Sequence, residues 1–213
     1  MFSIVDTRKV YDWVFGIYTP IAVGVIVLFT SLIVGAVLVY RRNTEVSRRH
    51  EANALEAAYA LVLTCVAAFL LYVTFTAEHR VDTASARERP AITVDVTGSR
   101  WEWTFSYPGH GITHESGAVG DQPLVVPANE PVRFRISSAD VIHSLWIPQL
   151  RFKRDAIPGS TQTVTLDFDR TGHFSGSCAE FCGLLHADMV FTASVITPRA
   201  FRSWLASDGR ART

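Results

Sequence analysis

One apolar segment sets the architecture of this chain: IAVGVIVLFTSLIVGAVLVY, residues Ile21–Tyr40. No charged residue occurs between Val14 and Tyr40. About 20 apolar residues in a helix span a hydrocarbon core of roughly 30 Å, so we predict a transmembrane helix at about residues 14–40. The segment is too long for the core of a signal peptide, and no small-residue cleavage site follows it. We therefore expect a helix that is retained.

A second uncharged segment, AAYALVLTCVAAFLLYVTFTA, runs from Ala57 to Ala77 and predicts a second spanning helix at about residues 54–77. The alternative, two buried helices of a soluble protein, is weaker because such helices rarely stay uncharged over this length. Residues 41–50 between the segments carry four arginines, which places this loop in the cytoplasm. The N-terminus and everything after Arg80 would then lie on the periplasmic side of a bacterial inner membrane.

Beyond the helices the sequence changes character. Polar residues 81–90 predict a linker, and short segments then alternate with period two, as in Ile92–Val96 and Val132–Ile136. Turn residues separate these segments, which indicates a β-sandwich or small barrel over residues 91–213. The full chain has 20 Lys+Arg and 20 Asp+Glu, and this balance excludes a basic nucleic-acid binder.

The soft metal ligands of the chain gather in CAEFCGLLHADM, residues Cys178–Met189. Thiolate and thioether groups favour copper, whereas a zinc site normally has no methionine ligand. A mononuclear blue copper site needs one cysteine, so two thiolates bridging two metals would account for the second. The alternatives without a metal are a disulfide between Cys178 and Cys182, a surface position for His186 and a core position for Met189.

A second imidazole ligand must come from elsewhere in the fold. His143 is the best candidate, because it lies in a strand-like apolar segment, DVIHSLWIP. We expect His110 and His114, in a glycine-rich segment, to be exposed, and we interpret His173 as structural. Cys65 lies within the second apolar segment, where it is best read as a small hydrophobic residue.

These motifs resemble subunit II of the haem-copper cytochrome c oxidases. The resemblance covers nearly the whole chain and rests on the ligand segment above together with DVIHS (Asp140–Ser144), DAIPG (Asp155–Gly159) and WEWTF (Trp101–Phe105). It implies a two-helix transmembrane hairpin (residues 1–80), a linker (81–90) and an all-β, cupredoxin-like Greek-key domain (91–213) on the periplasmic side.

The resemblance also implies a binuclear copper centre, CuA, with a definite division of ligands. Cys178 and Cys182 would bridge both coppers. The terminal ligands would be His143 and Met189 on one copper, and His186 with the backbone carbonyl of Glu180 on the other.

Three side chains receive further roles from the resemblance. The Glu180 carboxylate would hold a magnesium ion at the interface with the catalytic subunit, with a solvated loop carboxylate as the alternative. Trp101 would be the residue through which electrons arrive, although Trp103, expected on the same strand face, is a rival. Glu56 would lie near the mouth of a proton channel, or would simply interact with the helix dipole.

The function implied is that of an electron-transfer subunit of a respiratory oxidoreductase. It would take electrons from cytochrome c at CuA and pass them to haem in catalytic subunit I, where oxygen is reduced to water. Two alternatives stay open: the CuA subunit of a nitric oxide reductase, and a membrane-anchored copper-binding protein with no catalytic partner. Expected partners are subunit I and the other oxidase subunits, a redox donor and the bilayer, with no nucleic acid.

The identity of the donor is left open by the charge of the second half. From Pro90 onward the chain has 11 Lys/Arg against 12 Asp/Glu, so strong steering of a basic cytochrome c is not supported. The candidate donors are a neutral-faced cytochrome c, a membrane-tethered cytochrome, a fused cytochrome in a partner subunit and a small copper protein. The sequence has no C-x-x-C-H motif, so the chain carries no covalently attached haem of its own.

Overall fold

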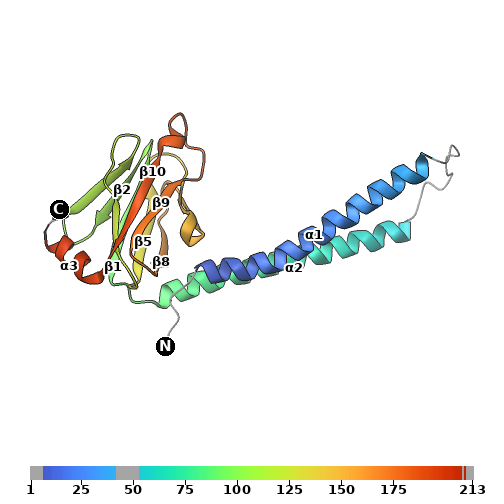
Figure 1. The fold of residues 1–213 in the computed structure, drawn as a ribbon, viewed down its shortest axis with the longest axis horizontal. Helices are drawn as coiled ribbons and strands as arrows, with labels where there is room; N and C mark the ends of the chain where they lie inside the picture. The colour runs from blue at the N-terminus through green and yellow to red at the C-terminus, as the bar shows by residue number, and fades with distance from the viewer. Residues whose placement is uncertain (1–6, 42–52, 208, 210–213) are drawn as a thin grey trace. The chain divides into compact units, whose positions relative to one another are not determined.

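The computed structural model describes residues 7–41, 53–207 and 209. It contains two compact units, Val10–Arg80 and a β-rich unit formed by Val81–Thr213 with Met1–Lys9. Helix α1 (Thr7–Tyr40) and helix α2 (Asn53–Arg87) supply the first unit (Figure 1). Three arginines of the predicted cytoplasmic loop, Arg42, Arg48 and Arg49, lie outside the described residues.

Both helices are long and apolar enough to cross a membrane. At about 1.5 Å per residue, each exceeds the roughly 30 Å of a hydrocarbon core. Their apolar side chains are exposed within the structure: the most apolar window is 0% buried in the first helix and 11% buried in the second. A core helix of a soluble protein would bury these side chains, so the exposure favours a lipid environment.

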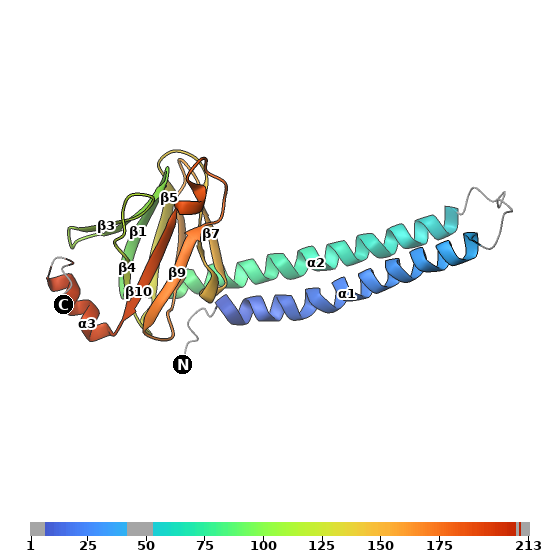
Figure 2. The same ribbon diagram turned by 45° about the horizontal axis from the view of Figure 1, so that its top comes forward.

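The two helices run antiparallel as a hairpin (Figure 2). The Tyr18 hydroxyl, in the first half of α1, donates to the carbonyl of Leu70 in the middle of α2, at 2.8 Å. The Arg80 guanidinium lies over the ring of Trp13, 4.9 Å from its centroid. The beginning of α1 and the end of α2 therefore lie at the same end of the hairpin.

Helix α2 continues to Arg87, whereas the sequence predicted a helix to about residue 77 and a linker over 81–90. The added turns contain no glycine or proline, and Pro90 follows them. From Val81 onward they belong to the β-rich unit, where the Thr165 hydroxyl donates to the Ser85 carbonyl at 3.1 Å and Arg154 pairs with Asp82 at 3.0 Å. Tertiary contacts thus extend the helix into a polar segment that the hydropathy pattern treats as linker.

The β-rich unit is a sandwich of two five-stranded sheets. The first sheet has the order β3 (Ile112–Gly117), β2 (Glu102–Tyr107), β1 (Ile92–Ser99), β5 (Val132–Ser138), β8 (Gln162–Leu166). The second has the order β4 (Leu124–Pro127), β10 (Val190–Ile196), β9 (Gly172–Cys178), β6 (His143–Ile147), β7 (Phe152–Ala156). The β1–β5 and β4–β10 pairs are parallel and join strands distant in sequence. The predicted fold class, two apolar helices followed by an all-β sandwich, is confirmed.

The core of the sandwich follows the period-two pattern of the sequence. Val94 and Val96 of β1 and Trp103 and Phe105 of β2 are all fully buried, with more exposed residues between them. Helix α3 (Pro198–Ala206) is capped by Thr197, whose hydroxyl accepts from the Ala200 amide, and packs two aromatic residues onto the sandwich. Short 3₁₀ turns, η1 (Pro148–Leu150) and η2 (His186–Asp188), complete the unit.

Candidate metal centre

Three neighbouring strands of the second sheet bring the predicted ligands to one end of the sandwich. His143 begins β6, Cys178 ends β9, and Met189 directly precedes β10. Because β9 runs antiparallel to both of its neighbours, the start of β6, the end of β9 and the start of β10 meet at the same edge. The backbone amide of Cys178 donates to the carbonyl of Met189 at 2.9 Å and fixes the base of the ligand loop.

The predicted donor atoms converge in this loop. The Sγ atoms of Cys178 and Cys182 lie 3.9 Å apart, and both thiols are free. Around Cys178 lie His143 Nδ1 at 3.8 Å and the Glu180 carbonyl oxygen at 3.3 Å. Around Cys182 lie the last two donors, His186 Nδ1 at 3.5 Å and Met189 Sδ at 3.9 Å.

This donor set fits copper. Among the described residues, His143, Cys178 and Cys182 form a buried group whose ligand atoms all lie within 4.8 Å of one another. His143 and Met189 are fully buried, and both cysteines are nearly so. Two sulfurs, imidazole nitrogens and a thioether at this spacing match the preference of copper for soft donors.

The His143 ring is oriented by a carboxylate that the sequence did not single out. Its Nε2–H donates to Asp140 Oδ1 at 2.9 Å, and because a carboxylate only accepts, the proton must sit on Nε2. The Nδ1 lone pair then faces the Cys178 sulfur. A carboxylate on the far nitrogen is the usual partner of a metal-binding histidine. The spacing of three residues within DVIHS is a signal that could have pointed to Asp140.

Burial and hydrogen bonding shift the pKa values of two groups at this site, Asp140 and Cys182. Burial tends to raise the pKa of the Asp140 carboxyl, but hydrogen bonds from His143 and from two backbone amides outweigh burial and hold that pKa well below its usual range. Burial, followed by the nearby Cys178 sulfur, raises the pKa of the Cys182 thiol to about 11. The Cys182 thiol is therefore protonated at neutral pH, and metal binding must displace its proton.

Trp101 lies in the turn before β2, whereas Trp103 lies within the strand. The expectation that the two share a strand face is therefore wrong. Trp103 is fully buried, and its ring packs edge-on against His143 with centroids 6.0 Å apart. Trp101 is partly exposed, and its indole packs against the ligand loop so closely that a Cβ on Gly183 would lie 3.2 Å from its Nε1. Trp101 is therefore partly open to solvent on one side and contacts Gly183, the residue after Cys182, on the other.

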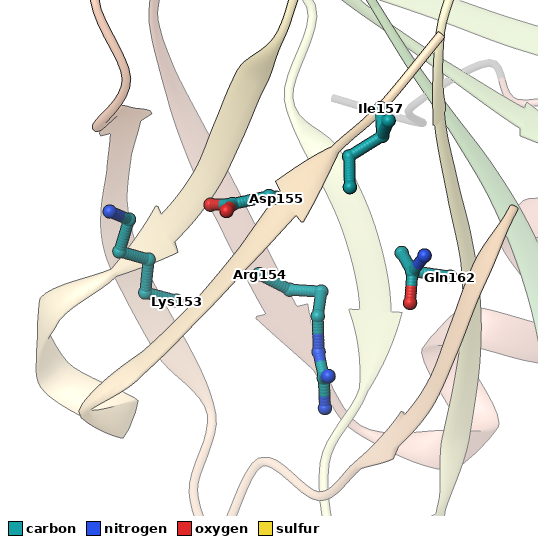
Figure 3. Close-up of a pocket in the computed structure, with 5 residues that line it drawn as sticks. All are labelled: Lys153, Arg154, Asp155, Ile157 and Gln162. Carbon is teal, nitrogen blue, oxygen red and sulfur yellow. The ribbon is translucent and has the colours of Figure 1, made fainter. Parts of the chain in front are cut away.

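The Glu180 side chain is exposed, and its carboxylate lies 3.4 Å from Lys153 Nζ. Lys153 also lines an open pocket of about 370 Å³ at the β7 edge, together with Arg154, Asp155, Ile157 and Gln162 (Figure 3). Asp155 accepts from the Ser144 hydroxyl at 2.7 Å. Through Asp155 and Ser144 the pocket is therefore connected to the residue next to His143. None of the predicted copper ligands lines it.

The remaining candidates are not among the residues whose donor atoms converge in the ligand loop. Glu56 is exposed in the first turn of α2, and Cys65 is exposed in the same helix. His114 was expected to be exposed but is buried in β3, where Nδ1 lies 2.7 Å from the Pro123 carbonyl oxygen. Its place between the buried Ile112 and Ser116 gives the period-two signal that could have revealed this.

Comparisons with known proteins identify relatives of this chain. The family described as "Cytochrome C oxidase subunit II, periplasmic domain" matches residues 113–196. Cytochrome c oxidase subunit 2 of Cereibacter sphaeroides is 30% identical over 231 residues, covering 91% of this chain and 74% of the relative. A probable cytochrome c oxidase subunit 2 of Streptomyces coelicolor is 30% identical and covers 84% of this chain and 69% of its own length.

Two solved structures share the fold of the β-rich unit. One is the periplasmic domain of subunit II of cytochrome oxidase of Bradyrhizobium japonicum, with a TM-score of 0.54 and 32% identity, covering 57% of this chain and 95% of that one. The other is a mixed disulfide intermediate between a thioredoxin-like protein and subunit II of cytochrome c oxidase, with a TM-score of 0.51 and 31% identity, covering 57% of this chain and 93% of that one. These likenesses identify the sandwich as cupredoxin-like.

Proposed function

Because this chain belongs to the cytochrome c oxidase subunit II family, we propose that it receives electrons from cytochrome c at a binuclear copper centre and delivers them to haem in catalytic subunit I. As a family member, it is a subunit of a haem-copper oxidase, an oxidoreductase. Family membership favours oxygen over nitric oxide as the terminal acceptor. It also favours a subunit of an enzyme over a free-standing copper protein.

The convergence of donors on two close cysteine sulfurs is the observation that carries this proposal. In each proposed pair of terminal ligands, one member lies near the Cys178 sulfur and the other near the Cys182 sulfur. His143 lies near Cys178 while Met189 lies near Cys182. The second pair divides in the same way, with the Glu180 carbonyl near Cys178 and His186 near Cys182. Two metals, each between both thiolates and one such pair, would satisfy every donor.

When bound, two copper ions sharing the thiolates would supply a one-electron relay. The chain's own contribution is a rigid frame: His143 is held on β6, Cys178 at the end of β9, and Met189 at the start of β10. Fixed ligands limit rearrangement between oxidation states, and burial excludes water from the soft donors. We propose that Trp101, which packs against the ligand loop from the surface, is where electrons arrive.

The outer face of the ligand loop is proposed to meet the catalytic subunit. There the Glu180 carboxylate would hold a magnesium ion, and binding would replace its surface contact with Lys153. That contact is between two half-exposed side chains, and such pairs contribute only about 0–1 kcal/mol. Lys153 is therefore a weak obstacle to a divalent ion.

The helical hairpin is proposed to anchor the chain in the inner membrane, with the β-rich domain on the periplasmic side. Contacts between the first part of α1 and the later part of α2 support this topology, because they put the N-terminus and the chain after α2 on the same side of the membrane. Glu56, at the opposite end of α2, would then face the cytoplasmic end of the membrane. There it would lie near a proton channel of the catalytic subunit.

A thioredoxin-like reductant is a further proposed partner, as the mixed disulfide of the related subunit II suggests. The thiols of Cys178 and Cys182 are close enough for oxidation to join them as a disulfide. Attack by a thioredoxin-like dithiol would pass through a mixed disulfide, restore both thiols and oxidise the reductant. Reduction of this kind would prepare the site for copper.

Purification of the full chain in gentle detergent tests the functional assignment. We expect a haem-containing partner to co-purify, and the complex to consume oxygen when supplied with reduced cytochrome c. A copper-loaded chain that purifies without haem would contradict the oxidase assignment, as would a complex that reduces nitric oxide but not oxygen.

A further inference from the structure

The Asp140 carboxylate links a surface arginine to a buried metal ligand. Its Oδ1 accepts from the Val141 amide at 2.6 Å and from His143 Nε2 at 2.9 Å. Its Oδ2 accepts from the Arg100 amide at 2.9 Å and from Arg100 Nε at 3.1 Å. Four donors therefore fix the carboxylate, with Oδ1 bonded to the His143 side and Oδ2 bonded to Arg100.

The two ends of this link differ sharply in exposure. The Arg100 side chain is 52% exposed and that of Asp140 is 23% exposed, whereas the His143 side chain is fully buried. Arg100 directly precedes Trp101, so the outer end lies next to the residue proposed to take up electrons. Charge at the surface can thus influence a ligand that solvent does not reach.

The His143 ring is held in place against Asp140. A Cβ on Gly98 would lie 3.0 Å from His143 Cγ, so β1 packs directly on the ring. Trp103 packs against it edge-on. The ring therefore has little room to turn away, and the Nε2–H bond stays directed at the carboxylate.

His186, the other proposed imidazole ligand, is placed differently. It is partly exposed, and its ring meets Phe181 edge-on with centroids 5.8 Å apart. Among the residues that the structure describes, no carboxylate is paired with its ring. The two proposed imidazole ligands consequently differ in their partners, because of the two only His143 donates to a carboxylate.

We propose that Arg100 and Asp140 form a positioning pair that sets the electron-donor strength of His143, and through it the reduction potential of the copper centre. The proposal rests on the proposed function, since it needs copper at this site. An unneutralised carboxylate makes the imidazole a stronger donor and favours the oxidised metal. Arg100 withdraws part of that charge and favours the reduced metal.

Single substitutions should move the potential in opposite directions. Asp140→Asn removes the anion and should raise the potential. Arg100→Gln leaves the carboxylate unneutralised and should lower it. Because hydrogen bonds to charged groups are about twice as strong as neutral ones, each change should alter the ratio of reduced to oxidised centre at a fixed solution potential on the order of tenfold.

The double variant separates this mechanism from simple charge effects through space. If Arg100 acts through Asp140, Arg100→Gln should have little effect once Asp140→Asn is present, whereas independent Coulomb effects would add. Arg135→Gln is the matched control, because Arg135 pairs with Asp95 on the first sheet and neither residue touches His143. It should leave the potential close to that of the unaltered chain.

The experiment is a spectroscopic redox titration of the copper-loaded full chain in detergent, for the unaltered chain, both single variants, the double variant and the control. Nitrogen hyperfine coupling of the His143 imidazole gives a second readout and should change in both single variants. Additive shifts, or hyperfine couplings equal to those of the unaltered chain, would overturn the proposal. Copper content and the two-copper spectrum of the unaltered chain test the proposed function separately, so failure of one is distinguishable from failure of the other.

Discussion

Met189 combines two roles, since its side chain is fully buried in the core and its sulfur lies 3.9 Å from Cys182 Sγ. Replacing it with leucine separates these roles, because leucine keeps the volume and removes the thioether. The fold should lose less than about 1.5 kcal/mol. The reduction potential of the copper-loaded protein should rise, because a donor to the oxidised metal is lost.

The measurement is a redox titration of Met189→Leu beside a thermal melt of its metal-free form. Leu145, buried on β6, offers the control: Leu145→Met changes the core by a similar amount without removing a ligand. An optical spectrum and potential identical to those of the unaltered protein would show that Met189 is a core residue only.

The Cys182 thiol gives a pH-dependent prediction for the metal-free protein. Because its pKa is raised from 9.0 to about 11 in the fold, the unfolded chain releases this proton first as pH rises. The contribution to stability is therefore complete below about pH 9 and is lost as the pH approaches 11. Alkylation of Cys182, mapped by peptide mass spectrometry, should stay slow until well above pH 9.

The denatured chain is the control for this reaction, and it should be alkylated with an ordinary thiol profile. Equal profiles for the folded and denatured chains would contradict the burial of Cys182. Copper uptake by the folded chain should quicken with rising pH for the same reason, since the thiolate is the metal ligand.

At the scale of elements, β9 and β10 hold the base of the ligand loop through close packing. Gly176 of β9 faces the Phe191 ring of β10, and a Cβ there would lie 2.0 Å from the ring. Gly176→Ala should therefore force the ring toward Phe105, whose centroid is 5.3 Å away. We expect a loss of about 1–3 kcal/mol and a fall of several degrees in melting temperature.

Ser175→Ala is the matched control, because Ser175 is exposed on the same strand and the change should be nearly neutral. Copper-loaded Gly176→Ala should regain part of the lost stability, since binding favours the folded state. A Gly176→Ala chain that melts with the control would show that Phe191 has room to move.

The sequence predicted the elements that have strong periodicity and missed features that depend on tertiary contacts. The apolar segments gave both helices, and period-two alternation gave β1 and β5 close to their observed bounds. The extension of α2 to Arg87 was missed because its polar residues are held by contacts within the β-rich unit, as Ser85 is by Thr165. Hydropathy carries no such information.

The candidate site likewise has a part that the sequence predicts and a part that depends on tertiary contacts. The spacing and chemistry of the ligand motif predicted which donors share a site, and the sandwich explains why His143, distant in sequence, meets the loop. The three-residue spacing within DVIHS could have pointed to Asp140, but no sequence pattern marks Arg100. Their link depends on how β1 and the loop before β6 approach each other, which no local pattern encodes.

At the scale of the whole molecule, charge balance constrains how a donor protein meets this chain. The residues from Pro90 onward carry 11 Lys/Arg and 12 Asp/Glu, so the long-range field of the domain is weak. The rate of electron uptake from a basic cytochrome c should therefore change little with ionic strength. Stopped-flow kinetics of the purified complex at increasing salt would check this, and a steep fall in rate would reveal an acidic docking face.

The number and electronic coupling of the bound metals bear most directly on the central claim, a binuclear copper centre on a membrane-anchored sandwich. Metal analysis and electron paramagnetic resonance of the purified, oxidised full chain should find about two coppers per chain, as two bridging thiolates require. They should also find a hyperfine pattern from one unpaired electron shared by two copper nuclei. A single copper with a mononuclear spectrum, or zinc with no copper signal, would contradict the account.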